Sequence, residues 1–418
     1  MLSQRKSQLS NSIPNEETDN NQTTQTLIPP PPRSPVLHSS PLSSTLLGSL
    51  KAILFASWTN ILLIFIPFGF IATRLNWSNI SIFILNFLAI IPLSNLFEFA
   101  VENIGLRVGA LTGSFLNFTF GNAVELIVSV IVLKQGQIRV VQASILGSIV
   151  SNLLLVLGMC FVAGGIYNKT QSFNMTTAQT SSSLITLACI SLIVPAALVS
   201  STNSLNDIKY EKGLLNLSHG MAIILLIIYV LFIFFYLKTH SCLYLSWDEY
   251  EKDEHPQLTL IASLLLLAVV AVFVAFSAEY LAGSIDGIVK PIGLTETFIG
   301  LILIPNISKI TEIVSIVRTS TVDADRTIRE VGNSSMQVAL FASPFLVILG
   351  WIIGQPMSLF FQLFETVVLF ISAMMTSILL QNGESNYLKG AILLATYLII
   401  ALGFYFCPNS YYYNTKII

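Results

Sequence analysis

The 418-residue sequence is 54% hydrophobic and only 10% charged, whereas soluble proteins carry about 25% charged residues. This composition excludes an ordinary soluble protein and indicates a chain that crosses a membrane many times. The formal net charge of -2 gives no reason to expect nucleic acid as a partner. No phosphate-binding glycine loop or nucleophile–base arrangement is apparent, so we expect neither an enzyme nor a cofactor.

Residues 1–45 are polar and rich in Ser, Asn, Gln, Thr and Pro. We predict a disordered cytosolic tail there, because such a segment cannot bury enough apolar surface to fold alone. Apolar runs long enough to cross a bilayer as helices follow in series. The predicted spans are residues 50–73, 79–103, 108–133, 139–165, 179–200, 217–237, 257–282, 294–317, 332–354, 357–381 and 387–407. The predicted fold is therefore an all-α polytopic membrane protein with about eleven transmembrane helices.

These spans divide into one extra N-terminal helix, at 50–73, and two groups of five. The first group covers 79–237, the second covers 257–407, and an acidic linker at 238–256 connects them. An odd number of spans gives the second group the opposite orientation, so we expect two inverted repeats. The distribution of Lys and Arg outside the spans favours a cytosolic N-terminus.

A carboxylate, Glu125, lies inside the third span. An ionisable group at this depth is costly unless it is paired, hydrated or neutralised, so a functional site is the default interpretation. Asn122, Glu125 and Ser129 are spaced three and four residues apart and share one helical face. Three oxygen-bearing side chains suit a hard cation. A protonated Glu125 that hydrogen-bonds a neighbouring helix is the alternative.

The same pattern recurs in the second group. Leu-Ile-Val-Ser-Val-Ile-Val follows Glu125, and Ile-Val-Ser-Ile-Val follows Glu312. In each group a basic loop and a helix with polar residues in an apolar run come next. Inverted repeats place such polar stretches face to face at the membrane midplane, so we expect Glu125 and Glu312 to meet there. Gly121 and Pro305 are the expected helix breaks. The alternative is that the two patterns resemble each other by chance, because the sequence is so rich in apolar residues.

With these motifs the sequence resembles the cation/proton exchanger family of the calcium/cation antiporter superfamily, most closely the fungal vacuolar calcium/proton exchangers. Three runs carry the resemblance, Gly121 to Ile127, Gln142 to Ser148 and Ser151 to Leu155. The resemblance implies an antiporter in the vacuolar membrane, surrounded by lipid. It would move calcium, with manganese as a second substrate, out of the cytosol in exchange for protons. A homo-oligomer is compatible with it.

The resemblance also implies a set of site residues. The metal-binding positions would be Asn122, Glu125, Ser148, Asn152, Glu312, Ser334 and Gln337. Two acidic positions, Glu102 and Glu279, fall on the helices that open each bundle and would serve proton coupling or the entrance.

The second repeat departs from the family pattern. Where the family has Gly-Asn-Ala-Ala-Glu-His, this sequence has Ser308-Lys309-Ile310-Thr311-Glu312-Ile313. Lys309 stands three residues before Glu312 on the same helical face. We expect its ammonium either to point at Glu312 and modulate calcium transport, or to snorkel to the interface on its long stem. A degenerate, non-transporting or altered-selectivity paralogue stays open as an alternative. A channel is less favoured, because one paired site in a single chain suits a transporter.

Overall fold

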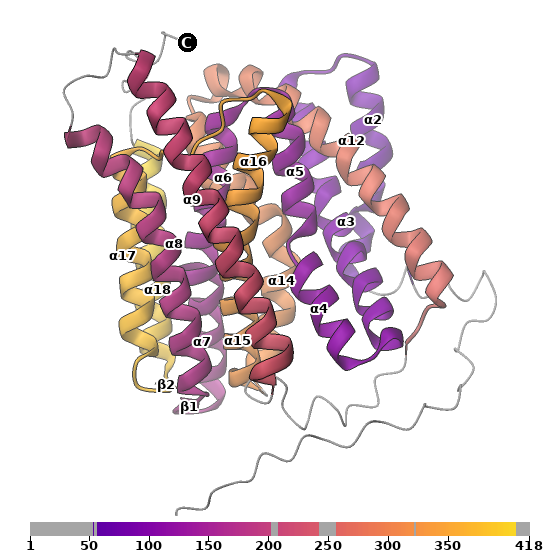
Figure 1. The fold of residues 1–418 in the computed structure, drawn as a ribbon. Coiled ribbons are helices and arrows are strands. Elements are labelled where there is room, and N and C mark those ends of the chain that lie inside the picture. The colour runs from indigo at the N-terminus through magenta and orange to yellow at the C-terminus, as the bar shows by residue number, and fades with distance from the viewer. Residues whose placement is uncertain (1–52, 54–56, 202–207, 242–255, 322, 407–418) are drawn as a thin grey trace, which may run out of the picture. The chain divides into compact units, whose positions relative to one another are not determined.

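A computed structural model describes residues 53, 57–201, 208–241, 256–321 and 323–406 (Figure 1). The predicted tail at 1–45 and most of the linker at 238–256 lie outside these residues. In chain order the elements are η1 (Trp58–Ile64), α2 (Phe65–Arg74), α3 (Asn79–Val108), α4 (Ala110–Phe120), α5 (Ala123–Lys134), α6 (Ile138–Val150), η2 (Ser151–Val156), α7 (Leu157–Tyr167), β1 (Gln171–Ser172), α8 (Met175–Ser201), α9 (Ile208–Phe234), η3 (Phe235–Thr239), α12 (Leu260–Ile292), α13 (Glu296–Phe298), η4 (Ile299–Leu303), α14 (Ile304–Ser320), α15 (Ala324–Gln337), η5 (Val338–Ala342), α16 (Ser343–Ile353), α17 (Leu363–Leu380), β2 (Glu384–Ser385) and α18 (Tyr387–Phe406).

Ten helices of the described chain are long and apolar enough to cross a membrane, and a shorter apolar helix, Trp58–Arg74, precedes them. Five of the ten lie before the linker and five after it. Several consist of consecutive elements, such as α6, η2 and α7. The predicted all-α polytopic fold is confirmed. The exception to helix is a short antiparallel pairing of β1 with β2.

The helix that corresponds to the predicted span 332–354 begins earlier in the sequence than predicted. We predicted its start at residue 332, where the apolar run begins, but α15 begins at Ala324. The Asp323 carboxylate accepts a hydrogen bond from the Arg326 backbone N–H and caps the helix. Side-chain capping of this kind satisfies a free donor of the first turn. The polar residues before 332 are therefore helical.

Another predicted span, 357–381, begins only at Leu363. Gly354 ends α16 with φ at 76°, a conformation that glycine adopts without steric cost. The residues that follow form a loop whose apolar side chains at Met357, Leu359 and Phe361 are fully buried. A buried run without helix looks like a membrane span in sequence alone, and this explains the error.

Gln142 of α6 holds that loop in place. Its side-chain Nε2 donates to the carbonyls of Ser358, at 3.0 Å, and Phe360, at 3.1 Å. Arg139 donates to the Gln142 Oε1 at 2.8 Å and forms a 2.6 Å ion pair with Glu365 at the start of α17. These polar groups therefore tie the start of α6 to the loop and to α17.

Helical geometry changes at the polar segments. The chain leaves the helix between α4 and α5, at Gly121 and Asn122, as predicted. Pro305 lies in the first turn of α14, directly after the π-helical turns of η4. Two further π-helical segments, η2 and η5, interrupt the corresponding helices of the two groups. Such π-bulges occur frequently at functional sites.

Helices of the two groups pack in a reciprocal pattern (Figure 1). The first helices of each group, α3 and α12, pack together, as do the fourth helices, α8 and α17. The third helix of each group packs on the fifth helix of the other, giving the pairs α7 with α18 and α16 with α9. A two-fold relation between inverted groups produces this exchange of partners. It also places α5 and η2 near α14 and α15.

Candidate functional site

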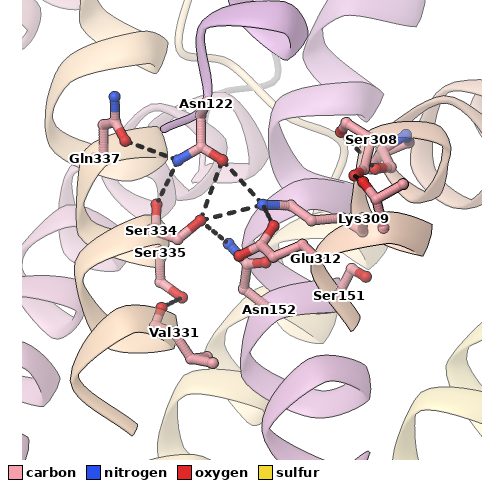
Figure 2. A network of polar contacts seen from close by, with 12 residues as sticks. Asn122, Ser151, Asn152, Ser308, Lys309, Glu312, Val331, Ser334, Ser335 and Gln337 are labelled. Carbon is pink, nitrogen blue, oxygen red and sulfur yellow. Dashed lines mark hydrogen bonds and ion pairs between the residues drawn. The ribbon is translucent and has the colours of Figure 1, made fainter. Parts of the chain in front are cut away.

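A network of buried polar side chains lies where α5, η2, α14 and α15 meet (Figure 2). Its members come from both groups of helices: Asn122, Asn152, Lys309, Glu312, Ser334 and Gln337. All six are positions that the sequence singled out. The fold therefore brings together predicted site residues that are up to 215 residues apart in the chain.

Asn122 is the centre of this network, because the helix break leaves it at the start of α5. Its Nδ2 donates to the Gln337 Oε1 at 2.8 Å and to the Ser334 carbonyl at 3.4 Å. Its Oδ1 accepts from the Lys309 Nζ at 2.9 Å and from the Ser334 Oγ at 3.1 Å. An ammonium donates and never accepts, so the contact with Lys309 decides which way the Asn122 amide faces.

Gln337 completes this side of the network. Its Nε2 donates to the Thr119 carbonyl at 2.7 Å. That carbonyl lies in the last turn of α4, where carbonyls have no donor within their own helix. The break at Gly121 therefore creates an acceptor that a side chain of the other group satisfies.

Lys309 is fully inside the protein, with 1% of its side chain exposed. Its ammonium donates to the Glu312 Oε2 at 2.7 Å, to the Asn122 Oδ1 at 2.9 Å and to the Ser334 Oγ at 3.1 Å. An ammonium has three donors, and here each has an oxygen partner.

Of the two predicted orientations of Lys309, the one towards Glu312 is confirmed and snorkelling is wrong. Lys309 lies in the middle of the span Glu296–Val317. At 1.5 Å per residue the nearer end is about 12 Å away along the helix axis. A lysine stem does not reach that far, so the ammonium has to find oxygen partners inside the bundle.

The Glu125 side of the site is bonded differently. Glu125 lies in the first turn of α5, and Ser148 of α6 faces it. Asn152 donates its Nδ2 to the Ser334 Oγ at 3.0 Å. The Glu125 Oε2, the Ser148 Oγ and the Asn152 Oδ1 are buried and have no hydrogen-bond partner within the described chain. Because buried oxygens are normally paired, the facing oxygens of Glu125 and Ser148 fit a bound cation.

The two remaining predicted carboxylates, Glu102 and Glu279, lie on exposed faces of α3 and α12. Neither is among the labelled residues of Figure 2. Their role in proton coupling or at the entrance stays a prediction. The Ser308 hydroxyl, also drawn in Figure 2, donates to the Pro305 carbonyl of its own helix at 3.2 Å.

A second chain of polar side chains was not predicted from the sequence. The Ser151 hydroxyl donates to the Asn306 Oδ1 at 2.7 Å, and the Asn306 Nδ2 donates to the Tyr397 hydroxyl at 2.7 Å. Glu98 of α3 was also missed, although it interacts electrostatically with Lys309 and Glu312. An amide directly after Pro305, and a carboxylate in an apolar run four residues before Glu102, were the available signals.

The family model described as sodium/calcium exchanger protein matches two segments of the chain, residues 78–238 and 262–406. The chain belongs to this family of exchangers. The vacuolar calcium ion transporter of Schizosaccharomyces pombe is 43% identical over 364 residues, which cover 87% of this chain and 88% of the relative. The Ca(2+)/H(+) antiporter of Aphanothece halophytica is 39% identical over 83% of this chain and 96% of its own. The predicted family resemblance is confirmed.

Solved structures agree with this assignment. Native YfkE matches with a TM-score of 0.70 at 29% identity, covering 84% of this chain and 100% of that one. An H+/Ca2+ exchanger, CAX, matches with a TM-score of 0.66 over 87% of this chain and 89% of its own. Because its identity is 12%, this second likeness concerns the fold alone.

Proposed function

We propose that this chain is a secondary antiporter that moves calcium out of the cytosol into the vacuole in exchange for protons. Its sequence relatives, a vacuolar calcium ion transporter and a Ca(2+)/H(+) antiporter, support the proposal. The observation that carries it is the pair of facing oxygens on Glu125 and Ser148, which are buried and have no hydrogen-bond partner in the described part of the chain, beside a network that joins both groups of helices. Calcium takes six to eight oxygen ligands of this kind, with water and backbone carbonyls among them.

Exchange follows from competition for one carboxylate. An ionised Glu125 at this depth needs a cation or a proton to offset its charge. Calcium and protons therefore displace one another from the same oxygens. A higher proton concentration on one side of the membrane then drives calcium release on that side.

Alternating access requires parts of the bundle to move against each other around the site. The helix break at Gly121 and Asn122, and the π-helical turns of η2, η4 and η5, give the chain places to bend next to the polar network. The excess of Lys and Arg on one side supports a cytosolic N-terminus, so that calcium enters from the side of the N-terminal tail.

The test is calcium uptake into sealed vesicles that bear the full-length chain, with and without an imposed pH gradient. We expect saturable uptake that needs the gradient and disappears with Glu125→Gln. Uptake that ignores the gradient would indicate a channel. Absence of uptake from a folded, inserted protein would reject antiport. Manganese in place of calcium tests the second substrate in the same assay.

A further inference from the structure

The two halves of the site differ at one equivalent position. Asn122 stands three residues before Glu125, and Lys309 stands three residues before Glu312. A residue at this spacing lies on the same helical face as the carboxylate that follows it. The first half therefore presents an amide beside its carboxylate, and the second half presents an ammonium.

The Lys309 ammonium binds the oxygens that a metal ion would use. Its three partners come from three helices: Asn122 at the start of α5, Glu312 on α14 and Ser334 on α15. Carboxylate, amide and hydroxyl oxygens are also the ligands that calcium prefers. In the first half, the Glu125 Oε2 and the Ser148 Oγ have no hydrogen-bond partner within the described residues. Lys309 thus already binds the Glu312 and Ser334 oxygens of the second half and the Asn122 oxygen of the first.

Charge adds to this difference. Glu125 and Glu312, both ionised, match the charge of a divalent ion, but Lys309 offsets one of them. A calcium ion that enters while the ammonium stays creates an excess positive charge in a buried region, where charges interact strongly. The ion also meets direct repulsion from Lys309. Glu98 of α3 also interacts electrostatically with Lys309, but its side chain is exposed by surface area and it contributes no oxygen to the ammonium's three hydrogen bonds.

We propose that Lys309 is a specificity-determining residue: its tethered ammonium occupies the Glu312, Ser334 and Asn122 oxygens and has to leave them before calcium gains both carboxylates. This inference rests on the proposed function, since it assumes that calcium binds between Glu125 and Glu312. The consequence is a site with low affinity for divalent cations and a relatively greater tolerance for monovalent ones.

The test is equilibrium binding of radioactive calcium to the purified full-length chain, at one pH, in detergent. The variants are Lys309→Asn, Lys309→Gln and Lys309→Met, which remove the charge with different lengths and hydrogen-bonding groups. Lys134→Asn is the matched control, because Lys134 is an exposed lysine at the end of α5. Thermal unfolding reports whether each variant is folded. We expect folded variants, since the Glu312 side chain is 22% exposed and water can hydrate it.

The expected result is a calcium Kd at least tenfold lower in the Lys309 variants and unchanged in Lys134→Asn. Sodium should compete less effectively with calcium in those variants than in the parent. An unchanged or higher Kd in folded Lys309 variants would overturn the inference. Loss of folding in all three variants would overturn it as well, because Lys309 would then be a structural tie.

The vesicle assay separates this inference from antiport. If the variants bind calcium more tightly but neither they nor the parent show proton-driven uptake, the role of Lys309 is supported and the antiport function is rejected. If proton-driven uptake is seen but calcium binding is unchanged in the variants, antiport is supported and the role of Lys309 is rejected.

Discussion

In the ion pair between Arg139 and Glu365, substituting one residue should cost the fold more stability than substituting the other. The Glu365 side chain is fully buried, whereas 26% of the Arg139 side chain is exposed. At their 2.6 Å separation, Coulomb's law gives an attraction of about 6 kcal/mol at an effective dielectric of about 20. The desolvation penalty of the two charged groups offsets much of this attraction. The measurable effect is therefore the loss of unfolding free energy when one partner is removed.

Arg139→Gln leaves a fully buried carboxylate without its cation. Breaking a buried pair in this way costs about 3–5 kcal/mol. Glu365→Gln leaves a partly exposed guanidinium that water can reach, and it keeps the shape that accepts the Gln362 backbone N–H at 2.9 Å. We expect it to cost about 1–3 kcal/mol, the penalty of a lost charged hydrogen bond. The double variant should lose much less unfolding free energy than the sum of the losses of the two single variants.

The assay is equilibrium unfolding in mixed detergent micelles for the parent, both single variants and the double variant. The pair Arg326 and Glu330 is the matched control, because both its side chains are exposed, 27% and 44%, at a separation of 3.0 Å. Its coupling energy should be about 0.3–0.5 kcal/mol. If the losses at Arg139 and Glu365 add within about 0.5 kcal/mol, or if Glu365→Gln costs more than Arg139→Gln, the reasoning is refuted.

Three further substitutions test the site and the packing around it. Glu125→Gln should abolish calcium uptake without unfolding the protein, since the amide keeps the shape but loses the charge; uptake at the parental rate would remove Glu125 from the site. Gly147→Ala should lower the yield of folded protein in size-exclusion chromatography, because an added Cβ overlaps the Leu301 backbone; Gly220→Ala, where nothing lies within 4 Å, is the control. Asn306→Leu should lower the unfolding midpoint, because it leaves the Ser151 and Tyr397 hydroxyls without their amide partner; an unchanged midpoint would show that this chain adds no stability.

Much of the fold and of the site could be predicted because both follow from local patterns. Apolar runs of membrane-spanning length located the spans, and carboxylates inside those runs located Glu125 and Glu312. Spacing along a helix then predicted that Asn122 and Lys309 share a face with them. The pattern left two orientations open for Lys309, and its distance from the helix ends decides between them.

The missed features depend on contacts between segments that are distant in sequence. Asn306 meets Ser151 and Tyr397 only after the third helix of one group packs on the fifth of the other. The π-helical turns before it also shift side chains relative to a regular helix, and no propensity rule places such turns. The loop after Gly354 was taken for helix, because a buried extended segment and a buried helix share an apolar composition.

The position of Asn122 suggests how ion binding connects to movement. Its amide donates to Gln337 and accepts from Lys309, so it joins α5 to both α15 and α14. An aspartate could accept but not donate, so an amide is needed to hold both contacts at once. On the proposed function, calcium would need the Asn122 oxygen and the Glu312 oxygen that Lys309 now binds. Binding therefore has to break contacts between the two groups of helices. The same side chains would therefore bind the ion and hold the two groups of helices together. Ion binding then shifts the equilibrium between the conformations of the bundle, and an exchanger requires this coupling.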